Sequence, residues 1–273
     1  MKISIITVNY NDETGLERTI RSVVGQSYSD KEFIVVDGFS KDGSVNVIRK
    51  YENNITKWIS EPDTGIYNAM NKGIKMATGD YCVFMNAGDV FYSSHVLQEV
   101  EPHLRSGKDI YNGNAIYVKD GNVIEWYRKC HKDISTLHFY MSSICHQATF
   151  IKTSLLRTFT YDESLRMVSD WKFWLESICI HKASYEAINV DICCFDTGGM
   201  TTTQSERGLK ERKKVLNEIF TAEEIEEYEQ QSKKRNLIKY IREGLSHRFW
   251  LYYSRLFMIG QVREVYRSSD IES

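Results

Sequence analysis

Phe33-Ile34-Val35-Val36-Asp37-Gly38 is an apolar, largely β-branched run that stops abruptly at an acidic residue and a glycine. A short apolar run that ends in turn residues is typical of a parallel strand buried on both faces. Residues 3–8, 57–60 and 81–85 are further strand candidates, and apolar residues at helical spacing lie between them. This alternation predicts an α/β fold with a mostly parallel, Rossmann-like sheet and helices on both of its faces.

Polar side chains follow the predicted strands at the point where each one ends. Asn9, Asp37, Asp63 and Asp89 all stand at or just after such an end. Ligands of parallel sheets bind beyond the carboxyl ends of the strands. We therefore expect these four side chains to line one cleft.

The composition is that of an ordinary globular protein. The 273 residues include 42% hydrophobic and 26% charged residues, which suits one α/β domain with an appendage. The net charge of −2 gives no reason to expect a nucleic-acid partner. No signal peptide or membrane-spanning run is recognised, and the six cysteines form no Cys-x-x-Cys pair. We therefore expect a cytoplasmic protein with reduced, mostly buried thiols.

The pattern changes after residue 105. Residues 110–118 and 122–127 are predicted to form a hairpin, and residues 146–151 another strand. Residues 170–180 are predicted to form a helix with Trp171 on its apolar side. The second half therefore departs from simple strand-helix alternation.

The sequence predicts an α/β domain, 1–205, followed by a helical C-terminal extension, 206–273. Within 233–267 there are nine Lys or Arg and two Glu, whereas the rest of the chain is acidic overall. Apolar residues run beside these cations, so the segment would either contact the inner membrane surface peripherally or pack on the domain or on a second copy in a homodimer. The sequence leaves these alternatives open.

Five segments together resemble the family 2 glycosyltransferases, which have the GT-A fold. These segments are 4–11, 33–44, 60–74, 84–89 and 168–174, and the resemblance covers roughly residues 1–205. The third segment has the form typical of the branch that builds bacterial exopolysaccharides such as colanic acid. The resemblance implies a GT-A domain with a nucleotide-binding half, 1–105, and an acceptor half, 106–205. It also implies inverting transfer of a hexosyl or N-acetylhexosaminyl group from a nucleotide-sugar donor, such as a UDP-sugar, to a saccharide or lipid-linked saccharide in surface polysaccharide synthesis.

The same resemblance assigns one group of residues to the nucleotide. Asp37 and Asp63 would accept hydrogen bonds from the base and the ribose, and Tyr10 would stack on the base. Gly38 stands where many members of the family carry a second aspartate. A turn role for Asp37 and simple packing of Tyr10 are the structural alternatives. The complete set of nucleotide-binding candidates is Val8, Asn9, Tyr10, Asp37, Asp63, Asn71 and Lys72.

Asp89 is the candidate metal ligand. In Asn86-Ala87-Gly88-Asp89 only the last acid remains where many members of the family have Asp-x-Asp. Mn²⁺ or Mg²⁺ would neutralise the diphosphate leaving group, and Mg²⁺ often uses only one or two protein carboxylates. The alternative role for Asp89 is to cap the helix that follows.

Asp170 is the candidate general base, which would take the proton of the acceptor hydroxyl. The alternative is an acid at a helix N-terminus that the helix dipole stabilises. Weaker acceptor contacts are expected from His146, Gln147 and Trp171, and residues 196–202 are a candidate lid. A nucleotidyltransferase or a non-catalytic nucleotide-binding protein on a similar sheet remains an alternative function.

Overall fold

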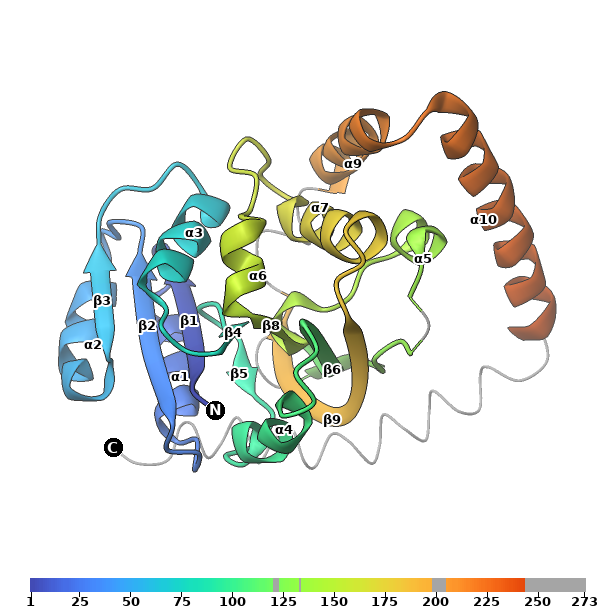
Figure 1. Ribbon diagram of the computed structural model, residues 1–273. Coiled ribbons are helices and arrows are strands. Elements are labelled where there is room, and N and C mark those ends of the chain that lie inside the picture. Colours follow the sequence, from blue (N-terminus) through green and yellow to red (C-terminus); the bar gives the residue numbers. More distant parts are fainter. Residues whose placement is uncertain (120–122, 133, 198–204, 244–273) are drawn as a thin grey trace.

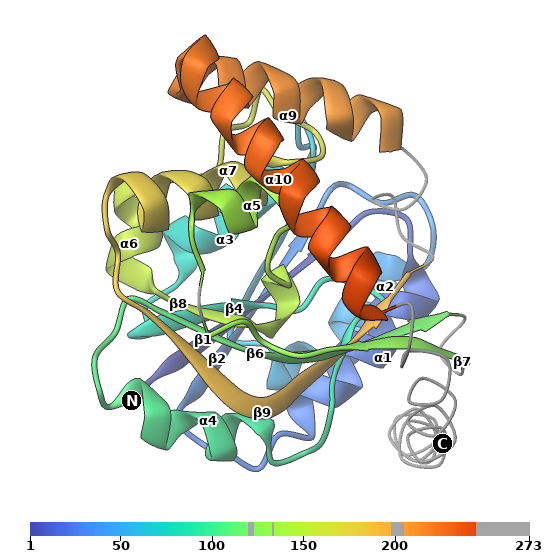
Figure 2. The same cartoon turned by 90° about the vertical axis from the view of Figure 1, so that its right-hand side faces the viewer.

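A nine-stranded sheet carries the fold, with the strand order β3-β2-β1-β4-β8-β6-β9-β5 and with β7 paired to β6 (Figure 1). The structure is a computed structural model that describes residues 1–273 except 120–122, 133, 198–204 and 244–273. Helices cover both faces of the sheet, and two long helices follow at the C-terminal end of the described chain (Figures 1 and 2). The predicted α/β class and the helical C-terminal extension are therefore confirmed.

The first half consists of parallel strands joined by helices. Strands β1, β2, β3 and β4 pair in parallel, and Asn9, Asp37 and Ser60 stand next to one another in the register at their ends. The elements are β1 (Ile3–Asn9), α1 (Glu13–Val24), β2 (Lys31–Asp37), α2 (Ser44–Lys50), η1 (Glu52–Asn54), β3 (Lys57–Ser60), α3 (Ile66–Met76) and β4 (Tyr81–Phe84).

Alternation along the strands explains why both faces are covered. Ile5 of β1 and Val35 of β2 pack with α1 and α2, whereas Ile6 and Val36 pack on the other face with α3. Both sets of side chains are buried, which is why these strands appear as continuous apolar runs in the sequence.

The second half inserts antiparallel strands into the sheet. Strand β8 pairs antiparallel with both β4 and β6, while the long β9 runs parallel to β6. The predicted hairpin is confirmed as β6–β7. The elements are β5 (Val90–Phe91), α4 (Val96–Leu104), β6 (Ile110–Lys119), β7 (Val123–Arg128), α5 (Thr136–Met141), η2 (His146–Ala148), β8 (Thr149–Lys152), α6 (Thr153–Thr158), α7 (Ser169–Trp174), η3 (Leu175–Ile180) and β9 (Tyr185–Asp196).

Two local predictions need correction. The strand expected from residue 146 begins at Thr149, because His146–Ala148 form a 3₁₀ turn. The helix expected over 170–180 is α-helical only from Ser169 to Trp174 and continues as the π-helical η3. All six cysteines are free, as expected.

The C-terminal helices are α9 (Ser205–Ile219) and α10 (Ala222–Glu243). Val215 of α9 is buried in the core, and α10 lies beside α5, where Tyr228 meets Tyr140 (Figure 2). Most of the basic segment 233–267 and most of the candidate lid lie outside the described residues. Within the described part of the chain, the helices are too short or too polar to cross a membrane.

A buried acid, Glu32, ties the start of the sheet together. Its side chain is 1% exposed and accepts hydrogen bonds from Ser4, Thr78 and Gly79, while the Lys2 ammonium lies 3.2 Å away. Burial by itself would raise the pKa of this carboxyl, but the hydrogen bonds from Ser4, Thr78 and Lys2 outweigh it and lower the pKa to about 2. The charged form is therefore the one that the fold stabilises.

We expect Glu32→Gln to lower the free energy of unfolding by about 1–3 kcal/mol at neutral pH. The NH₂ of the new amide faces the groups that donate hydrogen bonds to the carboxylate, so at least one of these bonds is lost. The folded pKa of about 2 lies below the ordinary value of 4.5, so the carboxylate's contribution is complete above pH 4.5 and is lost as the pH falls toward 2. Urea denaturation at a series of pH values measures this. The difference between wild type and variant should shrink over that window, while Glu206→Gln, at a side chain 88% exposed, should change little. A difference that does not depend on pH would contradict this account.

Candidate active site

The Asp37 carboxylate joins the ends of three parallel strands. It is fully buried. Its Oδ1 accepts hydrogen bonds from Asn9 Nδ2 (2.8 Å) and Ser40 Oγ (2.5 Å), and its Oδ2 accepts from Ser60 Oγ (2.6 Å) and Ser40 N (3.0 Å). Both oxygens are thus engaged in holding the strand ends and the following loop in place. A direct contact between Asp37 and a nucleoside stays a prediction.

Two exposed aromatic rings stand above this junction. Tyr10 is 65% exposed and Phe39 is 48% exposed, with the Lys41 ammonium 3.2 Å from the centre of the Phe39 ring. Asn11 and Phe39 both have positive φ, 52° and 64°, which is uncommon for residues other than glycine and costly for a bulky one. The loops therefore hold strained conformations that keep flat apolar surfaces at the strand ends.

Gly38 leaves room for the Asp63 carboxylate. A Cβ at position 38 would lie 2.5 Å from Asp63 Oδ2 and 3.1 Å from the Tyr10 ring. Asp63 Oδ1 accepts a hydrogen bond from Gly65 N (2.9 Å), and burial raises the pKa of Asp63 despite this bond and the nearby Lys72. Asp63 thus places a carboxylate where a side chain at position 38 would otherwise stand.

The other nucleotide candidates of the first half have structural partners. Val8 is buried in the core. Asn71 makes a reciprocal pair with the backbone of Tyr161, with distances of 2.8 and 3.0 Å, and so connects α3 to the segment before α7. Lys72 Nζ lies 2.9 Å from the Glu61 carboxylate. Nucleotide contacts by these residues remain predictions that the structure does not test.

The segment after β4 contains side-chain oxygen atoms of the kind that bind metal ions. Asp89 is 4% exposed, with Oδ1 accepting from Asp196 N (3.0 Å) and Oδ2 from Gln147 Nε2 (3.1 Å). Burial raises the pKa of Asp89 well above its ordinary value. Asn86 Oδ1 is buried and has no hydrogen-bond partner within the described chain. An orphaned amide oxygen three residues before a carboxylate suits a hard divalent cation in its chemistry, although no group of three or more His, Cys, Asp or Glu that could hold a metal ion occurs among the described residues.

Asp170 lies in the first turn of α7 and has a buried partner from α3. Tyr67 is 5% exposed, and its hydroxyl donates a hydrogen bond of 2.9 Å to Asp170 Oδ1. Burial and the neighbouring Asp170 charge raise the pKa of Tyr67 well above its ordinary value, so the hydroxyl stays protonated and remains a donor. Sequence reasoning missed Tyr67, whose helical spacing marks it only as a core residue.

The turn η2 connects the two candidate carboxylates. Gln147 donates a hydrogen bond to Asp89. Its neighbour His146 contacts Tyr161, whose ring centre lies 5.7 Å from that of Tyr67, the partner of Asp170. His146 is buried, its Nε2 is 2.6 Å from the Tyr161 hydroxyl, and burial lowers the pKa of His146 to about 4. A chain of hydrogen-bonded and packed side chains therefore runs from the predicted metal ligand, through this turn, to the predicted base.

Trp171 is also an interior residue. It is 3% exposed, its Nε1 donates to the Phe139 carbonyl (2.7 Å), and the Arg212 guanidinium lies 4.4 Å above its ring. The three acceptor candidates His146, Gln147 and Trp171 are thus all buried, which favours supporting roles for them. Their direct contact with an acceptor remains a prediction.

Solved structures share this architecture. S. aureus TarS 1–349 in complex with UDP-GlcNAc matches with a TM-score of 0.63 and 16% identity, covering 98% of this chain and 91% of that chain. The mannosyltransferase PcManGT of Pyrobaculum calidifontis, in complex with GDP-Man and Mn²⁺, matches with a TM-score of 0.59 and 15% identity over 99% and 76% of the two chains. This chain spans about half, 53%, of a longer TarS chain. At these identities the likeness concerns the fold, which is GT-A.

Sequence comparison defines the class more closely. An uncharacterized glycosyltransferase of Mycobacterium tuberculosis is 32% identical over 203 residues, which are 72% of this chain and 76% of that protein. A PGL/p-HBAD biosynthesis glycosyltransferase of Mycobacterium bovis is 30% identical over 62% of this chain and 67% of its own length. The protein is thus a glycosyltransferase. The model of the glycosyl transferase family 2 matches residues 4–169, and the chain belongs to that family.

We expect Gly38→Ala to weaken binding of the donor nucleotide about tenfold, because the new methyl group must displace the Asp63 carboxylate from the strand ends. Isothermal titration with UDP measures the change. Gly208→Ala in α9 is the matched control, since a Cβ there meets no atom closer than 3.8 Å. Unchanged affinity in Gly38→Ala would remove Asp63 from the nucleotide site.

Proposed function

We propose that the protein is an inverting glycosyltransferase that moves a hexosyl or N-acetylhexosaminyl group from a UDP-sugar to a saccharide acceptor in bacterial surface polysaccharide synthesis. The observation that carries this proposal is the chain of side-chain contacts from Asp89 through η2 to Asp170. The nucleotide-sugar complexes of TarS and PcManGT support the donor class. The mycobacterial relative named for PGL/p-HBAD biosynthesis supports a biosynthetic role for the transfer.

The nucleotide would lie across the ends of β1, β2 and β3. Tyr10 and Phe39 offer exposed rings on which a base can stack, and Asp63 offers a carboxylate that accepts hydrogen bonds from ribose hydroxyls or a base N–H. Asn9 Oδ1 is buried without a hydrogen-bond partner among the described residues, which makes it a further acceptor. Asp37 supports this surface from beneath, and the remaining nucleotide candidates of the family pattern, Val8, Asn71 and Lys72, flank it.

Asp170 is assigned the role of general base. Tyr67 holds Oδ1, and we assign Oδ2 to the acceptor hydroxyl. During a single displacement the acceptor oxygen bonds to the anomeric carbon while the bond to the diphosphate breaks and its electron pair leaves with the phosphate. The acceptor proton passes to Asp170. Attack opposite to the leaving group inverts the anomeric centre, and a general base of this kind contributes roughly 10²–10⁴-fold to the rate.

Asn86 and Asp89 are the residues that would hold Mn²⁺ or Mg²⁺. The orphaned Asn86 Oδ1 and the Asp89 carboxylate are oxygen donors of the kind that these cations prefer. The cation supplies positive charge to the leaving diphosphate. Gln147 and the backbone N–H of Asp196 orient the Asp89 carboxylate through their hydrogen bonds.

The cellular context is also part of the proposal. We place the reaction in the cytoplasm, with the basic segment 233–267 making peripheral contact with the inner membrane surface or joining two copies of the chain. Nine Lys or Arg against two Glu support the attraction to anionic lipid.

We expect Asp170→Asn to lower the turnover number for sugar transfer by about 10²–10⁴-fold while UDP affinity stays unchanged, because the amide cannot accept the acceptor proton. Tyr67→Phe should lower it by about tenfold and shift the acid limb of the pH–rate profile, because Asp170 Oδ1 loses its hydrogen bond. Rates with radiolabelled UDP-sugar and calorimetry with UDP measure the two properties separately.

Tyr28→Phe is the control for the loss of a tyrosine hydroxyl, because Tyr28 bonds to the carbonyl of Met1 at the other end of the sheet. It should leave transfer and its pH profile unchanged. Turnover at the wild-type level in Asp170→Asn would exclude Asp170 as the base.

For the metal site, we expect Mn²⁺ to bind in the presence of UDP and to bind at least about tenfold more weakly in Asn86→Ala and Asp89→Asn, because each loses an oxygen donor. Electron paramagnetic resonance of free Mn²⁺ reports binding without any need for turnover. Asn53→Ala, an exposed change in η1, is the control. Equal Mn²⁺ affinity in all variants would place the cation elsewhere.

A further inference from the structure

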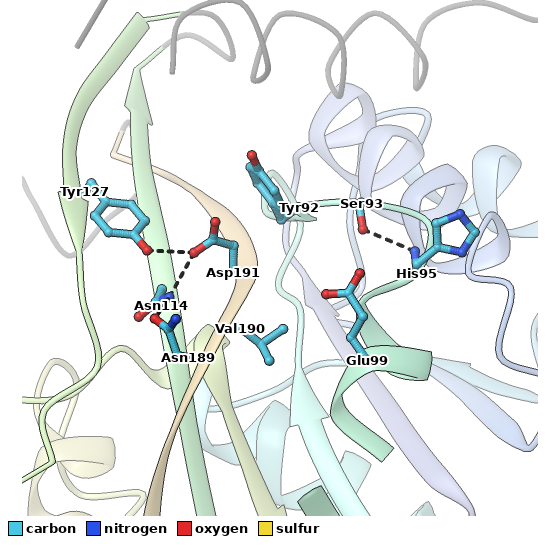
Figure 3. A pocket seen from close by; sticks show the side chains of 9 residues that line it. All are labelled: Tyr92, Ser93, His95, Glu99, Asn114, Tyr127, Asn189, Val190 and Asp191. Atoms are coloured by element: carbon cyan, nitrogen blue, oxygen red, sulfur yellow. Dashed lines mark hydrogen bonds between the residues drawn. The ribbon is translucent and has the colours of Figure 1, made fainter. Parts of the chain in front are cut away.

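A second concavity opens away from the residues assigned to the reaction. It lies between the start of α4 and the β6, β7 and β9 strands, and its volume is about 480 Å³ (Figure 3). Small-molecule sites commonly measure roughly 300–1,000 Å³, so the space is sufficient for a ligand. None of the residues that line it has a role in the proposed transfer.

One wall is built around Asp191 of β9. Its Oδ1 accepts hydrogen bonds from Tyr127 Oη (2.7 Å) and Asn114 Nδ2 (2.9 Å), and Asn189 Oδ1 lies 3.4 Å from the same Asn114 nitrogen. Figure 3 shows Tyr127 of β7, Asn114 of β6 and Asp191 of β9 converging. These bonds fix the position of the carboxylate and of the phenol ring before any ligand arrives.

The facing wall comes from the segment between β5 and α4. Tyr92 is anchored by a hydrogen bond of 2.9 Å from its backbone N to the Ile192 carbonyl, and its ring stands across the pocket from Tyr127 (Figure 3). His95 and Glu99 complete this side. Burial and the Asp191 charge raise the pKa of Tyr92, so its hydroxyl stays protonated.

The chemistry of the lining selects against several ligand classes. The described residues that line it include two carboxylates, Glu99 and Asp191, and no Lys or Arg, so these residues would repel a phosphate or nucleotide. Its polar side chains would be left without hydrogen-bond partners by a lipid chain. Two tyrosine rings with amides and carboxylates suit a neutral saccharide, whose hydroxyls both donate and accept hydrogen bonds.

The pocket is connected to the active site by two strands. Tyr92 follows Asp89 by three residues through β5, and Asp191 precedes Asp196 by five residues in β9. At about 3.3 Å per strand residue, the two sites lie on the order of 16 Å apart along β9. Since the backbone N–H of Asp196 bonds to Asp89, one rigid strand carries both sites.

We propose that this pocket is a second saccharide-binding site, which holds a neutral oligosaccharide of the acceptor or product at a distance from the reacting hydroxyl. Its ligand class rests on the proposed transfer to a saccharide, whereas its existence as a binding site is tested without turnover. Such a site would retain the growing chain by adding a second contact to the one at the active site.

Saturation-transfer NMR with maltohexaose, cellohexaose and chitohexaose as neutral probes, and with a hyaluronan hexasaccharide as an acidic probe, tests the proposal. At least one neutral probe should bind, and the acidic one should not. Asp191→Asn and Asn189→Ala should each weaken that binding about tenfold, while Asn53→Ala in η1 should leave it unchanged. Asn189 is exposed, so its replacement keeps the fold intact.

Two results would overturn the proposal: no neutral probe binds at millimolar concentration, or the bound probe is unaffected by both pocket variants. Asp170→Asn separates this proposal from the one on transfer. It should abolish transfer and leave saccharide binding at the pocket unchanged, whereas Asn189→Ala should do the reverse with a short acceptor. If Asp170→Asn does not reduce transfer, the proposed role of Asp170 in transfer is wrong, whereas the result on saccharide binding at the pocket is unaffected.

Discussion

The fully buried Asp37 carboxylate is the constraint on which the active-site end of the sheet depends. An ionised carboxyl placed inside a protein costs several kcal/mol unless hydrogen bonds compensate for the lost water. Here four donors from Asn9, Ser40 and Ser60 surround it. The donors come from three different chain segments, so satisfying one charge fixes the ends of β1 and β3 and the loop after β2 at the same time. The positive φ of Phe39, two residues after Asp37, follows from this clamp, and with it the exposure of the ring.

The strand ends have room for only a few side chains. This limit explains why the chain departs from the acidic pair that is usual in its family. Gly38 has no side chain, and Asp63 from the end of β3 fills the volume beside it. The carboxylate is thus supplied by the segment that follows β3. The segment after β4 shows a similar replacement. Asn86 contributes an amide oxygen there, and Gln147 donates a hydrogen bond to the carboxylate of Asp89. Loss of an acidic residue from a motif therefore need not mean loss of the local charge or of the oxygen donors.

Local patterns explain how much the sequence predicts. The four parallel strands and their order along the chain follow from apolar runs that end in polar residues, and the hairpin of β6 and β7 follows from its turn. The insertion of β8 between β4 and β6 is not a local property, because it depends on pairing between distant segments.

The partner of Asp170 is equally distant, since Tyr67 lies 103 residues earlier. Burial of Trp171 beneath Arg212 depends on a helix that lies beyond the region of family resemblance. The sequence shows which side chains are able to act as acids, bases or ligands, whereas tertiary packing decides which of them are exposed at the surface.

The C-terminal extension packs against the segments that carry the candidate site, although the sequence predicts it to be an appendage. Glu211 of α9 accepts hydrogen bonds from the backbone N–H groups of Arg166 and Met167, directly before α7. Arg212 donates to the carbonyl oxygens of Phe139 and Ser142 while it covers Trp171, the residue next to Asp170.

One turn of α9 thus contacts both the segment that leads into the proposed base and the segment that leads into η2. Because η2 also contacts Asp89, the position of α9 is coupled through packed and hydrogen-bonded groups to both candidate carboxylates.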